Sequence, residues 1–172
     1  SYAAVDLEWL GSSSGIMQIG GLSAGEGNVI SGNSGDAILL NGRGQTVENA
    51  IIQGNVIGLG ADGATILGNG GAGIRLLATQ FAGALVTNTL IEGNTIAGSQ
   101  FGIYATGNVS ANIIQNNNFG TNAAGTLNFG NLGAGIYFES SVGGKNPDNN
   151  TIQGNRIAYN QNTGISLAGG SG

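Results

Sequence analysis

A 24-residue pattern with almost no charge occurs twice in this chain of 172 residues. The first copy, at 53–76, reads QGNVIGLGADGATILGNGGAGIRL. The second copy, at 115–138, reads QNNNFGTNAAGTLNFGNLGAGIYF in the same register. An internal period of this kind is typical of repeat architectures, in which each repeat packs mainly on its neighbours. The repeat therefore constrains the fold more than any other feature of the sequence.

Two shorter motifs within this pattern recur along the whole chain. The first is an Asn corner, in which Gly or Asn precedes an Asn and an apolar residue follows two places later. The second is a small residue followed by Ile, and it comes 10, 19, 9, 19 and 10 residues after the successive corner asparagines. Short and long connections therefore alternate. The corner asparagines are Asn28, Asn55, Asn94, Asn117 and Asn155, and the isoleucines are Ile38, Ile74, Ile103, Ile136 and Ile165.

The segments between the motifs have the periodicity of strands. They are short and alternate apolar with polar residues, and none carries a sustained helical stripe. The shortest repeat, from Asn94 to Asn117, is 23 residues long, whereas a strand–helix–strand unit needs about 30. The sequence therefore predicts an all-β fold, a parallel β-helix of about five to six coils with alternating short and long turns.

In such a fold, equivalent residues of successive coils stack about 4.8 Å apart. The isoleucines listed above would form one inward ladder, and two further ladders would lie at 30, 57, 96, 119, 157 and at 52, 91, 114, 152. The corner asparagines would form a structural ladder, because Asn tolerates left-handed backbone and stacked amides bond to one another. A binding role for this buried row is the minor alternative.

From Gly20 to Leu167 the chain resembles the right-handed parallel β-helix repeat proteins of the pectate-lyase-like superfold. It is most similar to long bacterial secreted or surface proteins with GNVIG…LGNGGAGI repeats. The resemblance implies a single-stranded right-handed β-helix and an extracellular or cell-surface location. Enzymes of this superfold act mostly on acidic polysaccharides and use clustered carboxylates or His. A fold alone does not establish such an activity.

Composition argues against those activities here. The chain has no His and no Cys, and its nine carboxylates mostly occupy different repeat positions. Glu26 and Glu92 both directly precede the Gly-Asn corner, but Gln53 occupies the coil between them. We therefore predict no catalytic residue, no metal and no cofactor. Four basic residues and a net charge of −5 disfavour nucleic acid, and no apolar run is long enough to span a membrane.

One outward row is the candidate for a ligand or partner face. The residue after each second-motif Ile should point away from the core, which places Arg75, Tyr104 and Tyr137 on three consecutive coils, between Leu39 and Ser166. Aromatic side chains spaced in this way can stack on sugar rings or anchor a partner. Ordinary cross-strand pairing is the competing interpretation, since aromatic residues favour sheets.

The ends of the β-helix are the second candidate surface. We divide the chain into an N-terminal strand and flexible joint at 1–15 and a β-helix at 16–172. Residues 1–10 alternate apolar and polar side chains. They would form a strand of the first coil, or leave it to pair with the open edge of a neighbour. A third alternative is that the chain is part of a longer array. The residues proposed for assembly are Val5, Leu7, Trp9, Ile165 and Leu167.

The sequence thus favours a non-enzymatic, structural β-helix outside the cell. It would assemble head to tail into a filament, or extend a larger surface or adhesive protein. Its partner would be another copy of itself or further repeats of a longer chain. The alternative is a carbohydrate-binding or polysaccharide-active module with a glycan as its partner.

Overall fold

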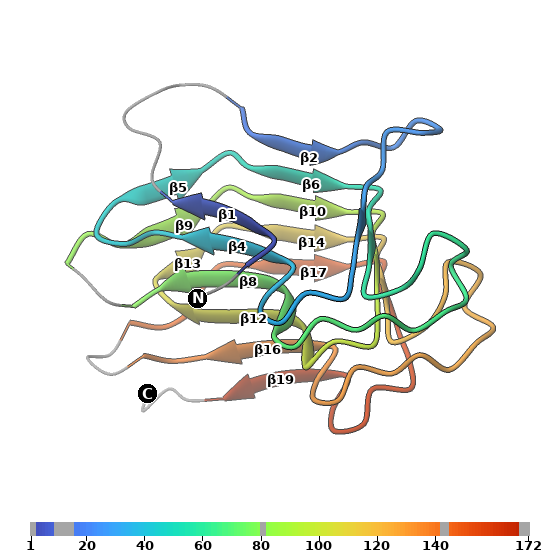
Figure 1. The fold of residues 1–172 in the computed structure, drawn as a ribbon. Coiled ribbons are helices and arrows are strands. Elements are labelled where there is room, and N and C mark those ends of the chain that lie inside the picture. The colour runs from blue at the N-terminus through green and yellow to red at the C-terminus, as the bar shows by residue number, and fades with distance from the viewer. Residues whose placement is uncertain (1–2, 9–15, 80–81, 142–144, 169–172) are drawn as a thin grey trace.

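The structure, a computed structural model, describes residues 3–8, 16–79, 82–141 and 145–168. Within these ranges the chain forms strands and no helix, and all strand pairs are parallel. The strands stack into four sheets (Figure 1), so the predicted parallel β-helix is confirmed. Sheet A, in front in Figure 1, has six strands, sheets B and C have five each, and sheet D has three.

The bounds of the strands are as follows. Sheet A contains β1 (Val5–Glu8), β4 (Ile38–Asn41), β8 (Ala72–Ala78), β12 (Phe101–Gly107), β16 (Ile136–Glu139) and β19 (Ile165–Ala168). Sheet B contains β2 (Gln18–Gly20), β6 (Ile51–Gln53), β10 (Leu90–Glu92), β14 (Ile113–Gln115) and β17 (Thr151–Gln153). Sheet C contains β3 (Val29–Ile30), β7 (Val56–Ile57), β11 (Thr95–Ile96), β15 (Asn118–Phe119) and β18 (Arg156–Ile157). Sheet D contains β5 (Thr46–Glu48), β9 (Leu85–Thr87) and β13 (Val109–Ser110).

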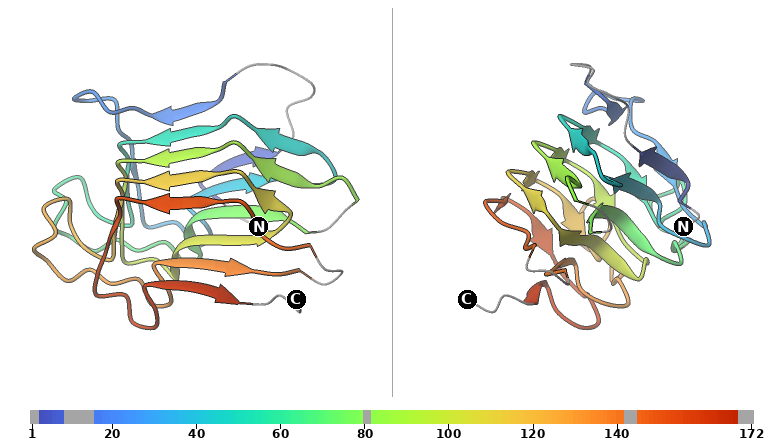
Figure 2. Two further views of the ribbon diagram at one scale, coloured as in Figure 1. Left: turned by 180° about the vertical axis from the view of Figure 1, so that it is seen from behind. Right: turned by 90° about the vertical axis from the view of Figure 1, so that its left-hand side faces the viewer.

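Each coil passes through sheet B, then sheet C, then sheet A, and the first three coils return through sheet D. We number the coils by their sheet B strands, so that coil 1 begins at β2 and coil 5 at β17. Strand β1 precedes coil 1 and adds a sixth strand to sheet A. The views in Figure 2 show the coils stacked in chain order, from blue at one end to red at the other.

The three predicted apolar ladders form the core. In sheet C, Ile57, Ile96 and Phe119 lie in register and are fully buried. Sheet B contributes the ladder that contains Ile52, Ile91 and Ile114, and sheet A the ladder that contains Ile38, Ile74, Ile103 and Ile136. Burying each of these side chains stabilises the fold by roughly 1.5–3 kcal/mol. The hydrophobic core is therefore a continuous column that runs through all the coils.

The predicted asparagine ladder is confirmed at the corner between sheets B and C. The Oδ1 of Asn94 accepts two hydrogen bonds from Asn55, at 2.9 Å from the backbone N–H and at 3.0 Å from Nδ2. The same pair of bonds links Asn28 to Asn55, Asn94 to Asn117, and Asn117 to Asn155. From Asn55 onward, each amide oxygen therefore accepts from the coil before it.

The residue before each corner asparagine in coils 2 to 5 adopts the left-handed backbone that the motif requires. Gly54, Gly93 and Gly154 have φ of 64°, 67° and 64°, and Asn116 has φ of 55° at the same position. A Cβ on Gly54 would lie 2.0 Å from the carbonyl oxygen of Gly21. Glycine is therefore needed there for both its conformation and its small size.

Two further polar ladders were missed by the sequence analysis. One lies at the corner between sheets C and A, and the other at the corner before sheet B, where Thr89 begins it. The same pair of hydrogen bonds to one Oδ1 recurs in both ladders, for example from Asn131 to Asn160 and from Asn112 to Asn150. The members of the first are Asn33, Asn69, Ser99, Asn131 and Asn160, and those of the second are Thr89, Asn112 and Asn150. The GN pairs at 68–69 and 130–131, inside the long repeat, were the available signal.

The long connections leave the β-helix after β7 and β15 and project from the same edge (Figure 1). Equivalent antiparallel bridges close them, Leu59 with Ile66 and Thr121 with Asn128. In the first loop the carboxylate of Asp62 accepts from the hydroxyl of Thr65 at 2.6 Å. This bond, with those from the Ala64 and Thr65 N–H groups, lowers the pKa of Asp62 to about 2.

Strand β1 lies on its own chain. It pairs with β4, with Val5 opposite Ile38 and Leu7 opposite Leu40, and both Val5 and Leu7 pack against the core. Of the alternatives for residues 1–10, the structure therefore has the strand of the first coil, for residues 5–8. Trp9 and the joint at 11–15 lie outside the described residues.

The central asparagines should stabilise the fold more than the terminal ones. We expect Asn94→Ala to lower the free energy of unfolding by at least ~3 kcal/mol, because it leaves several buried groups without partners, each costing about 1–3 kcal/mol. We expect Asn155→Ala to cost about 1–2 kcal/mol, because Asn155 is half-buried and water can replace the lost bonds. Urea unfolding followed by circular dichroism measures both; equal losses at the two sites would contradict this account of the ladder.

Candidate functional site

The predicted outward row lies on the outer face of sheet A. Leu39, Arg75, Tyr104, Tyr137 and Ser166 are successive partners in the strand register. The prediction that these residues are neighbours is confirmed. The expectation that Leu39 points into solvent is wrong, since Leu39 is completely buried outside the main core cluster.

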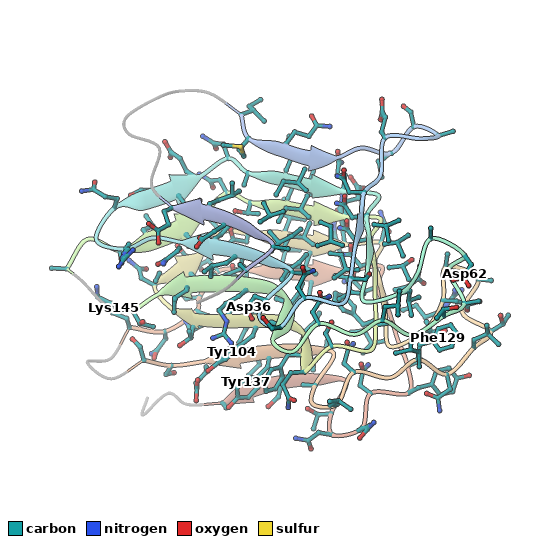
Figure 3. All side chains as sticks on the ribbon, viewed as in Figure 1. Asp36, Asp62, Tyr104, Phe129, Tyr137 and Lys145 are labelled. Carbon is teal, nitrogen blue, oxygen red and sulfur yellow. The ribbon has the colours of Figure 1, made fainter. Side chains whose placement is uncertain are left out.

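Arg75 contacts two side chains. Its Nε lies 2.8 Å from Oδ2 of Asp36, and its guanidinium carbon lies 4.4 Å from the centre of the Tyr104 ring. Figure 3 labels Asp36 and Tyr104 on this face of the molecule. Asp36 is buried, and its Oδ1 accepts a hydrogen bond from the N–H of Ala72 at 2.7 Å. The cation is thus pre-oriented over an aromatic face by a buried carboxylate. The sequence analysis did not identify Asp36 as part of this row.

Three aromatic rings pack together beside Arg75. The centres of Phe101 and Tyr137 are 5.4 Å apart with the rings nearly parallel, and Tyr104 lies 5.3 Å from Tyr137 and 5.2 Å from Phe101. Phe101 was missed; its position two residues before Ile103 in FGIYA placed it on the core side of the simple alternation. Mutual packing engages part of each ring, as cross-strand pairing predicts.

The hydroxyl of Tyr104 donates a hydrogen bond to Oε2 of Glu139, which comes from the next strand of sheet A. Burial raises the pKa of Tyr104 to about 12, and the bond to the Glu139 carboxylate adds to the shift. Tyr104 is therefore a neutral hydrogen-bond donor over the whole physiological range. It is not a candidate base.

Two open hollows flank Arg75 on this face. One, of about 350 Å³, is lined by residues that include Ser34, Asp36 and Gly71. The other, of about 540 Å³, is lined by residues that include Tyr104, Glu139 and Ser141. Arg75 and Leu77 border both hollows. Arg75 therefore lies between two open hollows on this face.

Glu26 and Glu92, which precede the same motif in the sequence, do not occupy equivalent positions in the structure. The two oxygens of Glu92 accept from the side-chain amides of Gln53 at 2.8 Å and Gln115 at 2.9 Å, as part of a surface ladder. The expectation that Glu26 shares this ladder position is wrong, because Gly20 pairs with Gln53 and Glu26 lies in an insertion before Asn28. Among the described residues, no group of three or more His, Cys, Asp or Glu could hold a metal ion.

The apolar ladders of the core reach both ends of the β-helix, and they are most exposed at the C-terminal end. At the C-terminal end, Ile165 is 46% exposed and Leu167 is 74% exposed, although both point along the inward ladder. At the N-terminal end, an open hollow of about 650 Å³ is lined by residues that include Val5, Ile19 and Ile30. Four of the five residues predicted for assembly therefore lie at the ends, and Trp9 lies outside the described residues.

Comparison with known families agrees with this architecture. A family model described as a right-handed β-helix region matches residues 14–172. The chain belongs to this right-handed β-helix family. Comparisons with curated proteins and with solved structures gave no match. The narrower resemblance to bacterial proteins with GNVIG repeats remains a prediction.

In this β-helix the part of the chain that the structure describes contains no helix long and apolar enough to cross a membrane.

The ionisation of Tyr104 provides a test of the row. Because the folded state favours the neutral phenol, Tyr104 should contribute stability that is present below pH 10 and is lost as the pH rises through about 12. In Glu139→Gln the pKa of Tyr104 should fall toward 10 yet stay above it, since burial remains. Ultraviolet titration of phenolate, with Tyr104→Phe to identify the signal, measures both values. An unchanged pKa in Glu139→Gln would contradict the contact.

Proposed function

We propose that this protein is a non-enzymatic structural β-helix, located outside the cell or on its surface, that assembles end to end with copies of itself. The observation that supports the proposal is the state of its two ends. Apolar ladders run the length of the core and remain exposed at Ile165 and Leu167, and they border the hollow at Val5, Ile19 and Ile30. The product would be a filament or an extension of a larger adhesive array.

An end of a β-helix is a boundary between coils at which one of the two coils is missing. Each interior boundary buries apolar ladders and pairs the strand edges, whereas an end leaves both open. Open, regular edges pair with other chains unless they are covered. Because the two ends differ, contact between them is heterologous, and a heterologous contact that does not close produces an open filament.

The absence of a reactive arrangement supports a non-enzymatic role. On the sheet A face, Asp36 forms an ion pair with Arg75, and Glu139 accepts a hydrogen bond from Tyr104. The chain contains no His or Cys to act as a base or a nucleophile. The proposal therefore assigns no cofactor, no metal and no nucleic acid to this protein.

Assembly should depend on the apolar side chains at the ends. We expect Leu167→Asp to raise the concentration at which assembly begins by roughly ten- to hundredfold, since burying a leucine is worth about 1.5–3 kcal/mol. Light scattering and negative-stain electron microscopy across a concentration series measure the onset. Leu127→Asp is the matched control, because Leu127 is an exposed leucine of the second long loop and not of a terminal strand. Equal effects of the two substitutions, or a native chain that stays monomeric throughout, would contradict the proposal.

A second candidate function is glycan binding on the sheet A face. The observation that favours it is the position of Arg75 and the face of Tyr104 between two hollows. A guanidinium can bind sugar carboxylates or hydroxyls, and an aromatic face can stack on a sugar ring.

The glycan hypothesis predicts a signal on a polysaccharide array. We expect any such signal to fall at least ~tenfold in affinity when Tyr104 and Tyr137 are both replaced by Ala, since aromatic contacts dominate such interfaces. Tyr159→Ala is the control, because Tyr159 is exposed and lies outside sheet A. Absence of binding to every polysaccharide would leave the row as ordinary cross-strand packing.

A further inference from the structure

The asparagine ladders have a direction, and each is interrupted at the ends of the described chain. At the N-terminal end, Asn28 and Asn33 donate their side-chain N–H groups to the next coil at 2.9 Å, and within the described residues their Oδ1 atoms accept no hydrogen bond. At the C-terminal end, Asn155 and Asn160 accept from the preceding coil. Among the same described residues their backbone N–H groups donate no hydrogen bond. One end therefore has spare acceptors, and the other has spare donors.

These spare groups match between the two ends. In the interior, a backbone N–H and an Nδ2 of one coil donate to the Oδ1 of the next coil, as from Asn117 to Asn155. A second copy whose coil 1 lay on coil 5 would present its Asn28 oxygen to Asn155 and its Asn33 oxygen to Asn160. Contact between two like ends would bring acceptors to acceptors or donors to donors. The third, shorter ladder would not continue, because Met17 has no amide oxygen.

The strand edges repeat this pairing. In sheet C the N–H of each strand donates to the corner asparagine carbonyl of the coil before it, as from Val56 to Asn28 and from Arg156 to Asn117, both at 2.8 Å. The next bond in the series would run from Val29 of a second copy to the carbonyl of Asn155. In the insertion at 21–27, the side chain of Leu22 reaches away from this edge, toward Gly93 of coil 3.

Sheet A does not fit this stacking as it stands. It has six strands, whereas sheets B and C have five each. If β2 and β3 of a second copy lie directly on β17 and β18, then β1 of that copy and β19 of the first copy require the same place on sheet A. If β1 instead lies on β19, a gap of one coil opens in sheets B and C, and the asparagines stand about 10 Å apart, too far to bond.

We propose that β1 is an intramolecular block on assembly: it occupies the edge of β4 that β19 of a second copy takes when the two copies stack coil on coil. This inference rests on the proposed end-to-end assembly and defines its polarity, its register and the step that controls it. The partner is a second copy of this chain, and the contact joins its C-terminal end to the N-terminal end of the first only.

The side chains of β19 fit the place that β1 holds. β1 presents Val5 and Leu7 inward over Ile38 and Leu40, and β19 has Ile165 and Leu167 in the same alternation. Ile165 carries one methylene more than Val5, so the exchange preserves the apolar ladder. It would also bury Leu167, which is 74% exposed in the single chain.

Charge favours the same exchange. On the outer face, β1 brings the carboxylates of Asp6 and Glu8 to the side of sheet A that holds Asp36. Burial, followed by the repulsion of Glu8, raises the pKa of Asp6, as expected of a carboxylate in an unfavourable place. Within the single chain, Glu8 forms an ion pair with Arg43 at 2.8 Å, which contributes to the pairing of β1 with β4. β19 carries the uncharged Ser166 and Ala168 at these two positions.

Cross-linking distinguishes the two registers. Separate chains carrying Val29→Cys and Arg156→Cys are mixed under oxidising conditions; both positions are exposed, and the native chain has no Cys. Coil-on-coil stacking places them about 4.8 Å apart, within the Cα range of a disulfide. Stacking with β1 in place separates them by about 10 Å and instead joins Asp6→Cys to Ser166→Cys. Each variant oxidised alone is the control for contact between like ends.

Release and retention of β1 test the block itself. We expect Val5→Asp with Leu7→Asp, which unseats β1, to lower the onset concentration of assembly by about tenfold or more. We expect the oxidised double variant Glu8→Cys and Asn41→Cys, which ties β1 to β4, to remain monomeric, and reduction to restore assembly. These two residues are direct partners in the strand register. Recovery on reduction shows that the tied chain is folded.

The outcomes separate the inference from the proposed function. A disulfide between 29 and 156, together with the block and its release, supports the inference. The inference would be overturned by a disulfide between 6 and 166, by a disulfide between two copies of the same single variant, or by assembly of the tied chain. End-to-end assembly would still stand. Absence of assembly in the native chain at every concentration would overturn both.

Discussion

The structure depends on one interaction, the double hydrogen bond by which the amide oxygen of a corner asparagine accepts from the coil before it. Asn94, which is fully buried, shows why this bond is demanding: its amide has two donor hydrogens and one oxygen, and all lie in the interior. A buried amide without partners costs about 1–3 kcal/mol for each group. The coils must therefore stack in strict register, and the apolar ladders follow.

This constraint explains which parts of a coil can vary in length and sequence without disturbing the stack. The long loops leave at a corner and return to it, so they alter no ladder, and their own bonds, such as those of Asp62, close them locally. The outer face of sheet A, whose longest strands are β8 and β12, carries bulky side chains. Arg75, Tyr104 and Tyr137 pack with one another and with carboxylates, so the face is preformed. A preformed face is compatible with sugar binding, but Arg75 and Tyr104 already have partners within the chain.

The same hydrogen bonds make the two ends of the β-helix chemically different. A ladder that is satisfied in every interior coil presents spare acceptors at one end and spare donors at the other, so the polarity of the chain becomes the polarity of any stack. The extra strand of sheet A makes the ends unequal in a second way. In the end-to-end assembly that we propose, stacking of the coils requires an exchange of β1 for β19.

The sequence by itself determined the fold, the strand period, the corner asparagines and the alternation of short and long turns, because a stacked repeat repeats its residues. It also placed Arg75, Tyr104 and Tyr137 in one row. Tertiary structure alone decided the partners of that row, since Asp36 and Glu139 arrive from other coils. It also decided the burial of Leu39, the displacement of Glu26 by an insertion, and the sixth strand of sheet A. These depend on which strand lies on which, a long-range pairing that periodicity within one coil does not specify.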